Sequence, residues 1–295
     1  MTLRHFKIFV AVCDTMSMTA AAEELYISQS AVSQTIADLE QFYHIRLFER
    51  LSRRLYLTQA GGKLLGYARH MVSMNADIEK DMKTLRDTGL VRVGASVTVG
   101  STVLPRLVSE FRKANPSIHI EVFEANTEQI SERLLTDKTD IGIVEGECMS
   151  PDLLSISLTD DELVLICGRH HRLASVTVVP PHELQQEDFI IREPGSGTRQ
   201  TFEDMMKAHA LSWKAAWVCN NADTIKAAVA AGLGVSVLSA RTVEKEARAG
   251  ELMMKPIQGI RFMRTFKIIY HKNKYLTEQM TKFTDYARLM CEEKE

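Results

Sequence analysis

The chain has 295 residues, of which 45% are hydrophobic and 25% are charged, and its formal net charge is -2. This length allows two or three domains with cores of their own, and the composition is that of an ordinary globular protein. The near-neutral balance excludes a protein that is basic along its whole length, so any surface that binds nucleic acid must be local.

The cysteines and the apolar segments indicate the compartment in which the protein works. The five cysteines are dispersed, with no close pair and no metal-ligand spacing, which indicates reduced thiols rather than disulfides. The first residues are amphipathic and lack the features of a signal peptide, and no apolar run has the length of a membrane span. We therefore expect a cytoplasmic protein that does not interact with membranes.

Residues 1–58 are expected to form short helices in close succession. Residues 20–22 are all alanine, which allows one helix to cross another closely, and Ser28 can cap the helix that follows. A close crossing followed by a helix with a polar outward face is typical of a helix-turn-helix that binds DNA. Glutamine can pair with adenine, and serine can bind most base edges. The polar residues at the start and on the outward face of this helix are Ser28, Gln29, Ser30, Ser33 and Gln34.

An arginine cluster follows the same helix, although acidic and basic residues are equal in number over the first 62 positions. Arginines placed here can contact phosphates or enter a narrow minor groove. The apolar stretch 55–57 is expected to belong to the strand pair of a wing. Taken alone, the cluster is also compatible with a solvated surface, and the helices with a generic three-helix core. The arginines are Arg46, Arg50, Arg53 and Arg54.

Residues 59–87 are predicted to form one long helix. Its seam residues recur at alternating spacings of four and three, with a single asparagine among apolar side chains. Such a heptad predicts a helix that pairs with a second copy, and the asparagine can fix the register. The alternative is a long helix that packs on its own domain. The seam positions are Leu64, Ala68, Met71, Asn75, Ile78, Met82 and Leu85.

Residues 90–295 alternate apolar strands with amphipathic helices, which predicts βαβ units and parallel sheets. Two successive sets of these units predict two lobes with a ligand cleft between them. Lobe I is expected to comprise residues 90–160 and 267–295, and lobe II residues 161–266.

The segment 191–199 (IREPGSGTR) lies between an apolar strand and a predicted helix. Its glycines allow close approach of a ligand, and the first amides of the helix are free to bind an anion. Ser196 and Thr198 add hydroxyls, and Arg199 can clamp a carboxylate, phosphate or sulfate. The alternative is an ordinary helix cap with turn glycines.

Other polar residues follow the carboxyl ends of predicted strands, where open α/β sheets bind ligands. Each of them alone is more often a helix cap than a ligand contact. A carboxylate at position 145 would repel a simple anion unless the ligand also carries an amine or hydroxyl groups. These residues are Ser96, Thr98, Thr127, Glu145 and Asn221.

Enzymatic signatures are not found. The sequence has no GxSxG, HExxH, P-loop or GxGxxG motif, and the doublet His170-His171 has no further metal ligand nearby. We therefore expect no catalytic residues, no bound metal and no cofactor.

The stretch from Leu3 to Gly62, with FxxFVAV followed by SMTAAAEELYISQSAVSQTIADLEQFYHIRLFERLSRRLYLTQAG, resembles the N-terminal domain of LysR-type transcriptional regulators. The resemblance implies a helix-turn-helix at 18–37 and a wing at Arg53 and Arg54. It also implies that Gln29, Ser30, Ser33 and Gln34 face the major groove. Many members have proline at the position of Ser30 and a basic residue at that of Gln34, so the bases read by Gln34 stay open. The 191–199 loop is similar to the effector loop of family members that regulate sulfur assimilation and autotrophic carbon fixation.

The expected fold is an α/β multidomain chain with an N-terminal winged helix-turn-helix (1–58), a dimerising linker helix (59–87) and a two-lobed α/β effector domain like periplasmic binding proteins (90–295). The expected function is regulation of transcription at double-stranded promoter DNA by a homodimer or homotetramer, under control of a small anionic metabolite. RNA polymerase is a further candidate partner. The alternative is a solute-binding protein or an enzyme built on the two lobes, which the missing export signal and residues 1–87 oppose.

Overall fold

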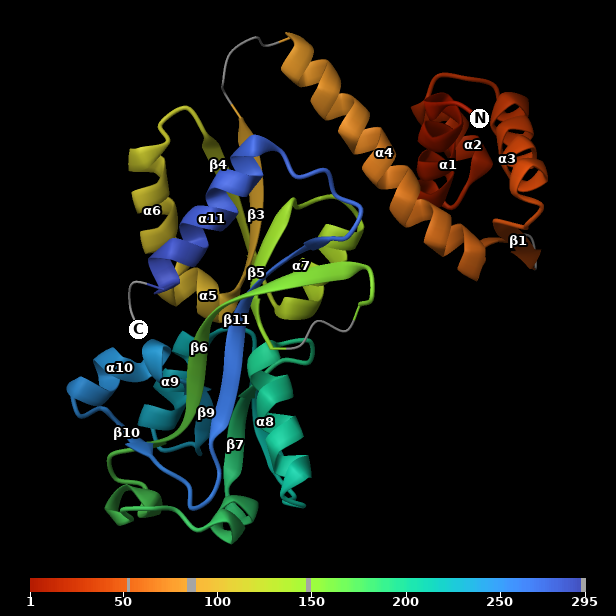
Figure 1. The fold of residues 1–295 in the computed structure, drawn as a ribbon. Coiled ribbons are helices and arrows are strands. Elements are labelled where there is room, and N and C mark those ends of the chain that lie inside the picture. Colours follow the sequence, from red (N-terminus) through yellow and green to blue (C-terminus); the bar gives the residue numbers. More distant parts are fainter. Residues whose placement is uncertain (52–53, 84–88, 147–149, 293–295) are drawn as a thin grey trace. The chain divides into compact units, whose positions relative to one another are not determined.

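The computed structural model describes residues 1–51, 54–83, 89–146 and 150–292. It divides into two compact units (Figure 1). The N-terminal unit comprises Met1–Asp87 with two short later segments, and the C-terminal unit comprises nearly all of the remainder. Each unit is described by itself.

The N-terminal unit has the order of elements that the sequence predicts, with the helix-turn-helix formed by α2 and the start of α3. Side chains cap both helices: Ser17 Oγ accepts the amide of Ala20 and Ser28 Oγ that of Ala31, each at 3.2 Å. Tyr26, between them, has the left-handed φ of 54° that turns the chain. The elements are α1 (Leu3–Thr15), α2 (Met18–Glu24), α3 (Gln29–Tyr43), β1 (Phe48–Leu51), β2 (Arg54–Leu57) and α4 (Gln59–Lys83).

The helix α4 packs on the helix-turn-helix core with one part of its length and is exposed along another part. Ala68 is fully buried in the core of the helix-turn-helix, and Leu64 packs against that core. Farther along, Met71 and Ile78 are 43% and 56% exposed, so these two seam positions stay uncovered within the unit. The side chain of Met82 and the whole of Leu85 lie outside the described residues. Leu64 and Ala68 therefore hold the helix to its own domain, and Met71 and Ile78 form an open apolar stripe on either side of the half-buried Asn75.

The C-terminal unit contains two lobes with separate cores. The core of lobe I lies around Val93, Phe111 and Phe283, and that of lobe II around Phe189 and Phe202. The elements outside the shared strands are β3 (Leu90–Ser96), α5 (Val97–Thr102), α6 (Leu104–Ala114), β4 (His119–Ala125), α7 (Thr127–Leu135), β5 (Ile141–Glu145), η1 (Arg172–Ser175), η2 (Pro181–Gln186), β7 (Asp188–Arg192), α8 (Gly197–Ala208), β8 (Lys214–Cys219), α9 (Ala222–Ala230), β9 (Ser236–Ser239), α10 (Ala240–Arg248), β10 (Leu252–Lys255) and α11 (Glu278–Glu292).

Two long strands, β6 (Leu153–Gly168) and β11 (Phe262–His271), run antiparallel to each other and pass through both lobes (Figure 1). They lie in a seven-stranded sheet of order β10-β6-β11-β5-β3-β4, with β9 paired to β6. The expected parallel pairing is correct for β3–β4, β3–β5 and β7–β8 but wrong for the strands around β6 and β11, which pair antiparallel. Because both lobes share these strands, a residue inside β6 or β11 can contact either lobe.

Candidate functional site

The outward face of α3 carries the residues predicted to read DNA. Gln29, Ser30 and Gln34 are exposed, whereas Ser33 is half-buried and Ser28 forms the N-cap. The side-chain amide of Gln34 donates to Asp38 Oδ1 at 2.8 Å, so an acidic residue that was not predicted lies beside it on this helix. Polar side chains therefore face away from the core along the first turns of α3.

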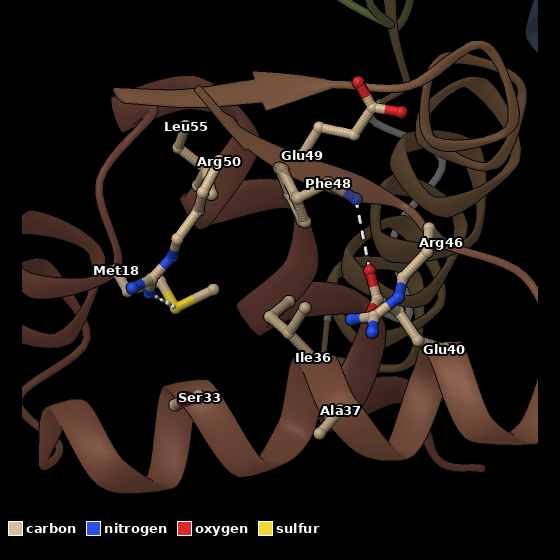
Figure 2. Close-up of a pocket in the computed structure, with 10 residues that line it drawn as sticks. All are labelled: Met18, Ser33, Ile36, Ala37, Glu40, Arg46, Phe48, Glu49, Arg50 and Leu55. Carbon is tan, nitrogen blue, oxygen red and sulfur yellow. Dashed lines mark hydrogen bonds and ion pairs between the residues drawn. The ribbon is translucent and has the colours of Figure 1, made fainter. Parts of the chain in front are cut away.

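A groove of about 490 Å³ separates α3 from the wing formed by β1 and β2 (Figure 2). Arg46 and Arg50 line it, and both are exposed. Arg50 reaches across the groove toward Met18, with its Nη2 3.6 Å from the sulfur. Arg54 is exposed on β2, and the predicted Arg53 lies outside the described residues. The three described arginines of the predicted cluster are thus all exposed, and two of them line the groove beside α3.

Glu40, on α3, ties this helix to the wing. Its carboxylate accepts the backbone amides of Leu47 at 2.8 Å and Phe48 at 3.2 Å, and Arg46 Nη1 at 3.1 Å. Figure 2 shows the carboxylate lying between the helix and the strand. The side chain of Glu40 is 13% exposed, compared with 82% for that of Arg46. Sequence reasoning missed this residue because nothing in a helical pattern indicates a contact with backbone seven residues later.

In the C-terminal unit, most of the predicted effector residues converge on Glu145, at the end of β5. Its side chain is 1% exposed. Three hydroxyls donate hydrogen bonds to the Glu145 carboxylate: those of Ser96, of Thr98 at 3.2 Å and of Thr198 at 3.5 Å. Thr127 Oγ1 donates to the Glu145 carbonyl at 3.4 Å. The hydroxyls come from both lobes, because Thr198 belongs to α8 and the others to lobe I.

Arg264 completes this cluster, and sequence reasoning did not find it. The antiparallel register places Arg264 on β11 opposite Asp161 on β6, and its Nε donates to Asp161 Oδ2 at 2.8 Å. Its two Nη atoms donate to the hydroxyls of Thr198 at 2.9 Å and Thr98 at 3.3 Å, and Nη1 lies 3.5 Å from Glu145 Oε1. Its side chain is 1% exposed. The sequence offers one sign of this role: Arg264 stands at a position of β11 where the alternation of the strand leads one to expect a buried apolar side chain.

The start of α8 lies against the same cluster. A Cβ at Gly197 would collide with the carbonyl oxygen of Glu145 and lie 2.8 Å from its Cγ, so only glycine allows this approach. The lobes also meet nearby, since the amide of Glu128 donates to the Gly195 carbonyl at 3.1 Å. Ser196 is 2% exposed, and its Oγ is one of the buried polar atoms in the described part of the chain that have no hydrogen-bond partner.

Two predicted effector residues are not part of the cluster. Arg199 points along lobe II, where it pairs with Glu203 at 2.8 Å, donates to the Arg192 carbonyl at 3.3 Å and lies over the ring of Trp213. Asn221 caps α9 by accepting the amide of Thr224 at 2.8 Å. Both side chains already have partners within lobe II.

Within the described ranges, no group of three or more histidine, cysteine, aspartate or glutamate side chains is placed to hold a metal ion. None of the described helices is long and apolar enough to cross a membrane.

Burial raises the pKa of the Cys13 thiol to about 12 and also raises the pKa values of Cys167 and Cys219. Cys148 lies outside the described residues.

The whole chain matches known families and proteins. Residues 3–62 match "Bacterial regulatory helix-turn-helix protein, lysR family", and residues 86–291 match "LysR substrate binding domain". The chain is 34% identical over 286 residues to "Uncharacterized HTH-type transcriptional regulator YeiE" of Escherichia coli K12, which covers 97% of each chain.

Solved structures agree with these matches. Full-length OxyR from Pseudomonas aeruginosa superposes with a TM-score of 0.70 at 22% identity, covering 98% of this chain and 95% of that one. The CcmR regulatory domain of Synechocystis PCC6803, solved in complex with 2-PG, has a TM-score of 0.65 at 30% identity and covers 69% of this chain and 97% of that one. The expected fold class, with an N-terminal helix-turn-helix, a long helix and an α/β substrate-binding domain, is confirmed. The protein belongs to the LysR family of transcriptional regulators, DNA-binding proteins with an effector-binding domain rather than enzymes.

Proposed function

We propose that this regulator binds specific promoter sequences and that a small anionic metabolite, held between the two lobes, controls this binding. The observation that carries the proposal is the buried, unpartnered hydroxyl of Ser196 at the start of α8, beside the cluster around Glu145 and Arg264. A buried hydroxyl without a partner is costly, and a ligand that accepts its hydrogen bond would remove that cost.

The position of Ser196 favours an anion. The amides of the first turn of α8 have no acceptor within the helix, and the positive end of the helix dipole lies there. The other hydroxyls proposed to line the site come from both lobes, so a ligand that binds them has different contacts when the lobes move apart. Such a difference in affinity between two arrangements is what couples a ligand to a second site. These hydroxyls belong to Ser96, Thr98, Thr127 and Thr198.

Relatives support a small ligand in this domain. The CcmR regulatory domain was solved with 2-PG and the effector-binding domain of QuiR with shikimate. We place Arg199 and Asn221 at the margin of the site, because their side chains already bind partners in lobe II.

For DNA, we propose that Gln29, Ser30, Ser33 and Gln34 read base edges and that Ser28, Arg50, Arg53 and Arg54 contact the backbone. Two copies joined through the open stripe of α4 would present two such helices to two half-sites. We propose that the protein regulates transcription as a dimer or tetramer in the cytoplasm, together with RNA polymerase.

The ligand site is tested on the full-length protein with inorganic sulfate and phosphate at constant ionic strength. An anion that binds the native state raises the melting temperature with concentration. Ser196→Ala should lower the affinity by about tenfold to a hundredfold, as expected for one lost hydrogen bond to a charged group. Ser236→Ala is the matched control, because Ser236 Oγ is also buried and unpartnered but lies on β9. Equal affinities of the two variants would refute the proposed site.

A further inference from the structure

The carboxylate of Glu145 occupies the hydroxyl groups that a bound anion would need. Ser96, Thr98 and Thr198 all donate to this one side chain. We propose that Glu145 is a tethered competitor for the anionic group of the effector and thereby sets which anions the site accepts. This inference rests on the proposed site between the lobes and concerns how that site is regulated.

The hydrogen-bond valence of the two threonines supports the inference. A hydroxyl has a single proton to donate. Thr98 donates its proton to Glu145 at 3.2 Å while it accepts from Arg264 at 3.3 Å, and Thr198 accepts from Arg264 at 2.9 Å. In this arrangement the hydroxyl of Thr98 has no proton left for a ligand. An incoming anion must therefore take these protons from Glu145.

The charges in the cluster act in the same direction. Arg264 faces two buried carboxylates, with Asp161 at 2.8 Å and Glu145 at 3.5 Å. Asp161 has further partners, the hydroxyl of Ser239 at 2.6 Å and the side chain of Arg241 at 3.6 Å. Glu145, by contrast, is held mainly by hydroxyls, which carry no net charge. An anion brought to these hydroxyls meets a like charge in a buried setting, where repulsion is strong.

Glu145 also helps to hold the lobes together before any ligand binds. Its side chain contacts Thr198, in the first turn of α8, and its carbonyl lies against Gly197. When an anion displaces the carboxylate, the contact between β5 and α8 changes with it. The competitor therefore does two things: it lowers the affinity for a bare oxyanion, and it makes anion binding alter the junction between lobes.

The test measures sulfate and phosphate affinity of the full-length protein by melting temperature at constant ionic strength. Glu145→Gln keeps the size and the hydrogen-bonding oxygen but removes the charge, so the affinity should rise by about tenfold, the equivalent of about 1.4 kcal/mol. Glu187→Gln is the matched control, because Glu187 is also buried and paired with an arginine, Arg172, at 2.5 Å, but lies outside the cluster. It should leave both affinities unchanged.

The outcomes separate this inference from the proposed site. If wild type binds sulfate and Ser196→Ala weakens that binding, but Glu145→Gln leaves it unchanged, the site stands and the competitor is refuted. A fall in affinity with Glu145→Gln also refutes it and makes Glu145 a ligand contact. If neither wild type nor any variant binds either anion, both proposals fail.

A second variant decides the matter if Glu145→Gln does not fold. Glu145→Asp keeps the charge but draws the carboxylate back from Thr198, the longest of its hydroxyl contacts. Its affinity for sulfate should rise by about threefold, less than that of a neutral residue. Unchanged or lower affinity overturns the competitor.

Discussion

Arg264, on β11, donates a hydrogen bond of 2.9 Å to the hydroxyl of Thr198, in the first turn of α8. Both lobes share β11, so this bond connects the shared strand directly to the loop that carries Ser196. The same guanidinium binds Thr98 in lobe I. Displacement of Thr198 at the proposed ligand site would therefore act directly on a strand that passes through both lobes.

Removal of the Arg264 guanidinium should destabilise the C-terminal unit. Arg264→Met leaves Glu145 buried without its arginine and leaves Asp161 with only the more distant Arg241, at 3.6 Å; breaking a buried ion pair typically costs about 3–5 kcal/mol in the free energy of unfolding. Urea unfolding of the full-length protein measures the change. The control is Arg261→Met, since Arg261 pairs with Glu162 at 3.0 Å but is 70% exposed and should matter little. Equal effects of the two substitutions would contradict this role of Arg264.

Glu40 and Glu49 should affect DNA binding in opposite directions, although both are acidic residues near the groove. Glu40→Gln weakens the hold of α3 on the backbone of Leu47 and Phe48, so DNA affinity should fall by about tenfold, the equivalent of one or two hydrogen bonds. Glu49→Gln removes a negative charge from the exposed wing, so affinity should rise slightly. Fluorescence anisotropy at one salt concentration measures both. If Glu40→Gln also tightens DNA binding, then Glu40 affects this binding through its charge and not by positioning α3.

The open stripe of α4 should pair two copies. Ile78→Asp places a charge on the predicted seam, where Ile78 is 56% exposed in the single chain, and should shift the protein toward monomer in sedimentation experiments. Ala76→Asp, which adds the same charge to an exposed position off the seam, should leave the oligomer intact. A dimer unaffected by Ile78→Asp would place the interface elsewhere.

Alkaline pH should destabilise the N-terminal unit through Cys13. Burial raises the pKa of this thiol from 9.0 to about 12, whereas the unfolded chain ionises it near the ordinary value. The stability that comes from the neutral thiol is therefore complete below about pH 9 and is lost as the pH rises toward 12. Cys13→Ala should show a smaller fall in the free energy of unfolding over this range than wild type. Identical alkaline profiles would show that Cys13 is not the group responsible.

The sequence predicts the local parts of the two sites. The face of α3 follows from a helical period and a cap, and the positions of Ser96, Thr127 and Ser196 follow from the rule that ligands lie at the carboxyl ends of strands. The same rule predicts Glu145, but its hydrogen bonds to the hydroxyls of Ser96 and Thr98 depend on tertiary structure.

The contacts that the sequence does not predict are those that depend on pairing between segments far apart in the chain. Arg264 meets Asp161 only through the antiparallel register of β11 and β6. Leu154, Ile156 and Leu158 alternate with polar residues, which indicates a strand in the first half of β6, but this pattern does not show which strand pairs with it. Arg199 has the right charge and position for an anion clamp, but Glu203, one helical turn later, and Trp213 hold it within lobe II.

The most direct test of the account compares the affinity of the full-length protein for DNA from upstream of its own gene with that for a scrambled fragment of equal length and composition. Both are measured at one salt concentration, for wild type and for a variant with Gln29→Ala and Gln34→Ala. We predict that wild type prefers the upstream fragment by at least about a hundredfold, and that the variant loses most of this preference while its binding to the scrambled fragment hardly changes. Equal affinity of wild type for both fragments would contradict sequence-specific regulation.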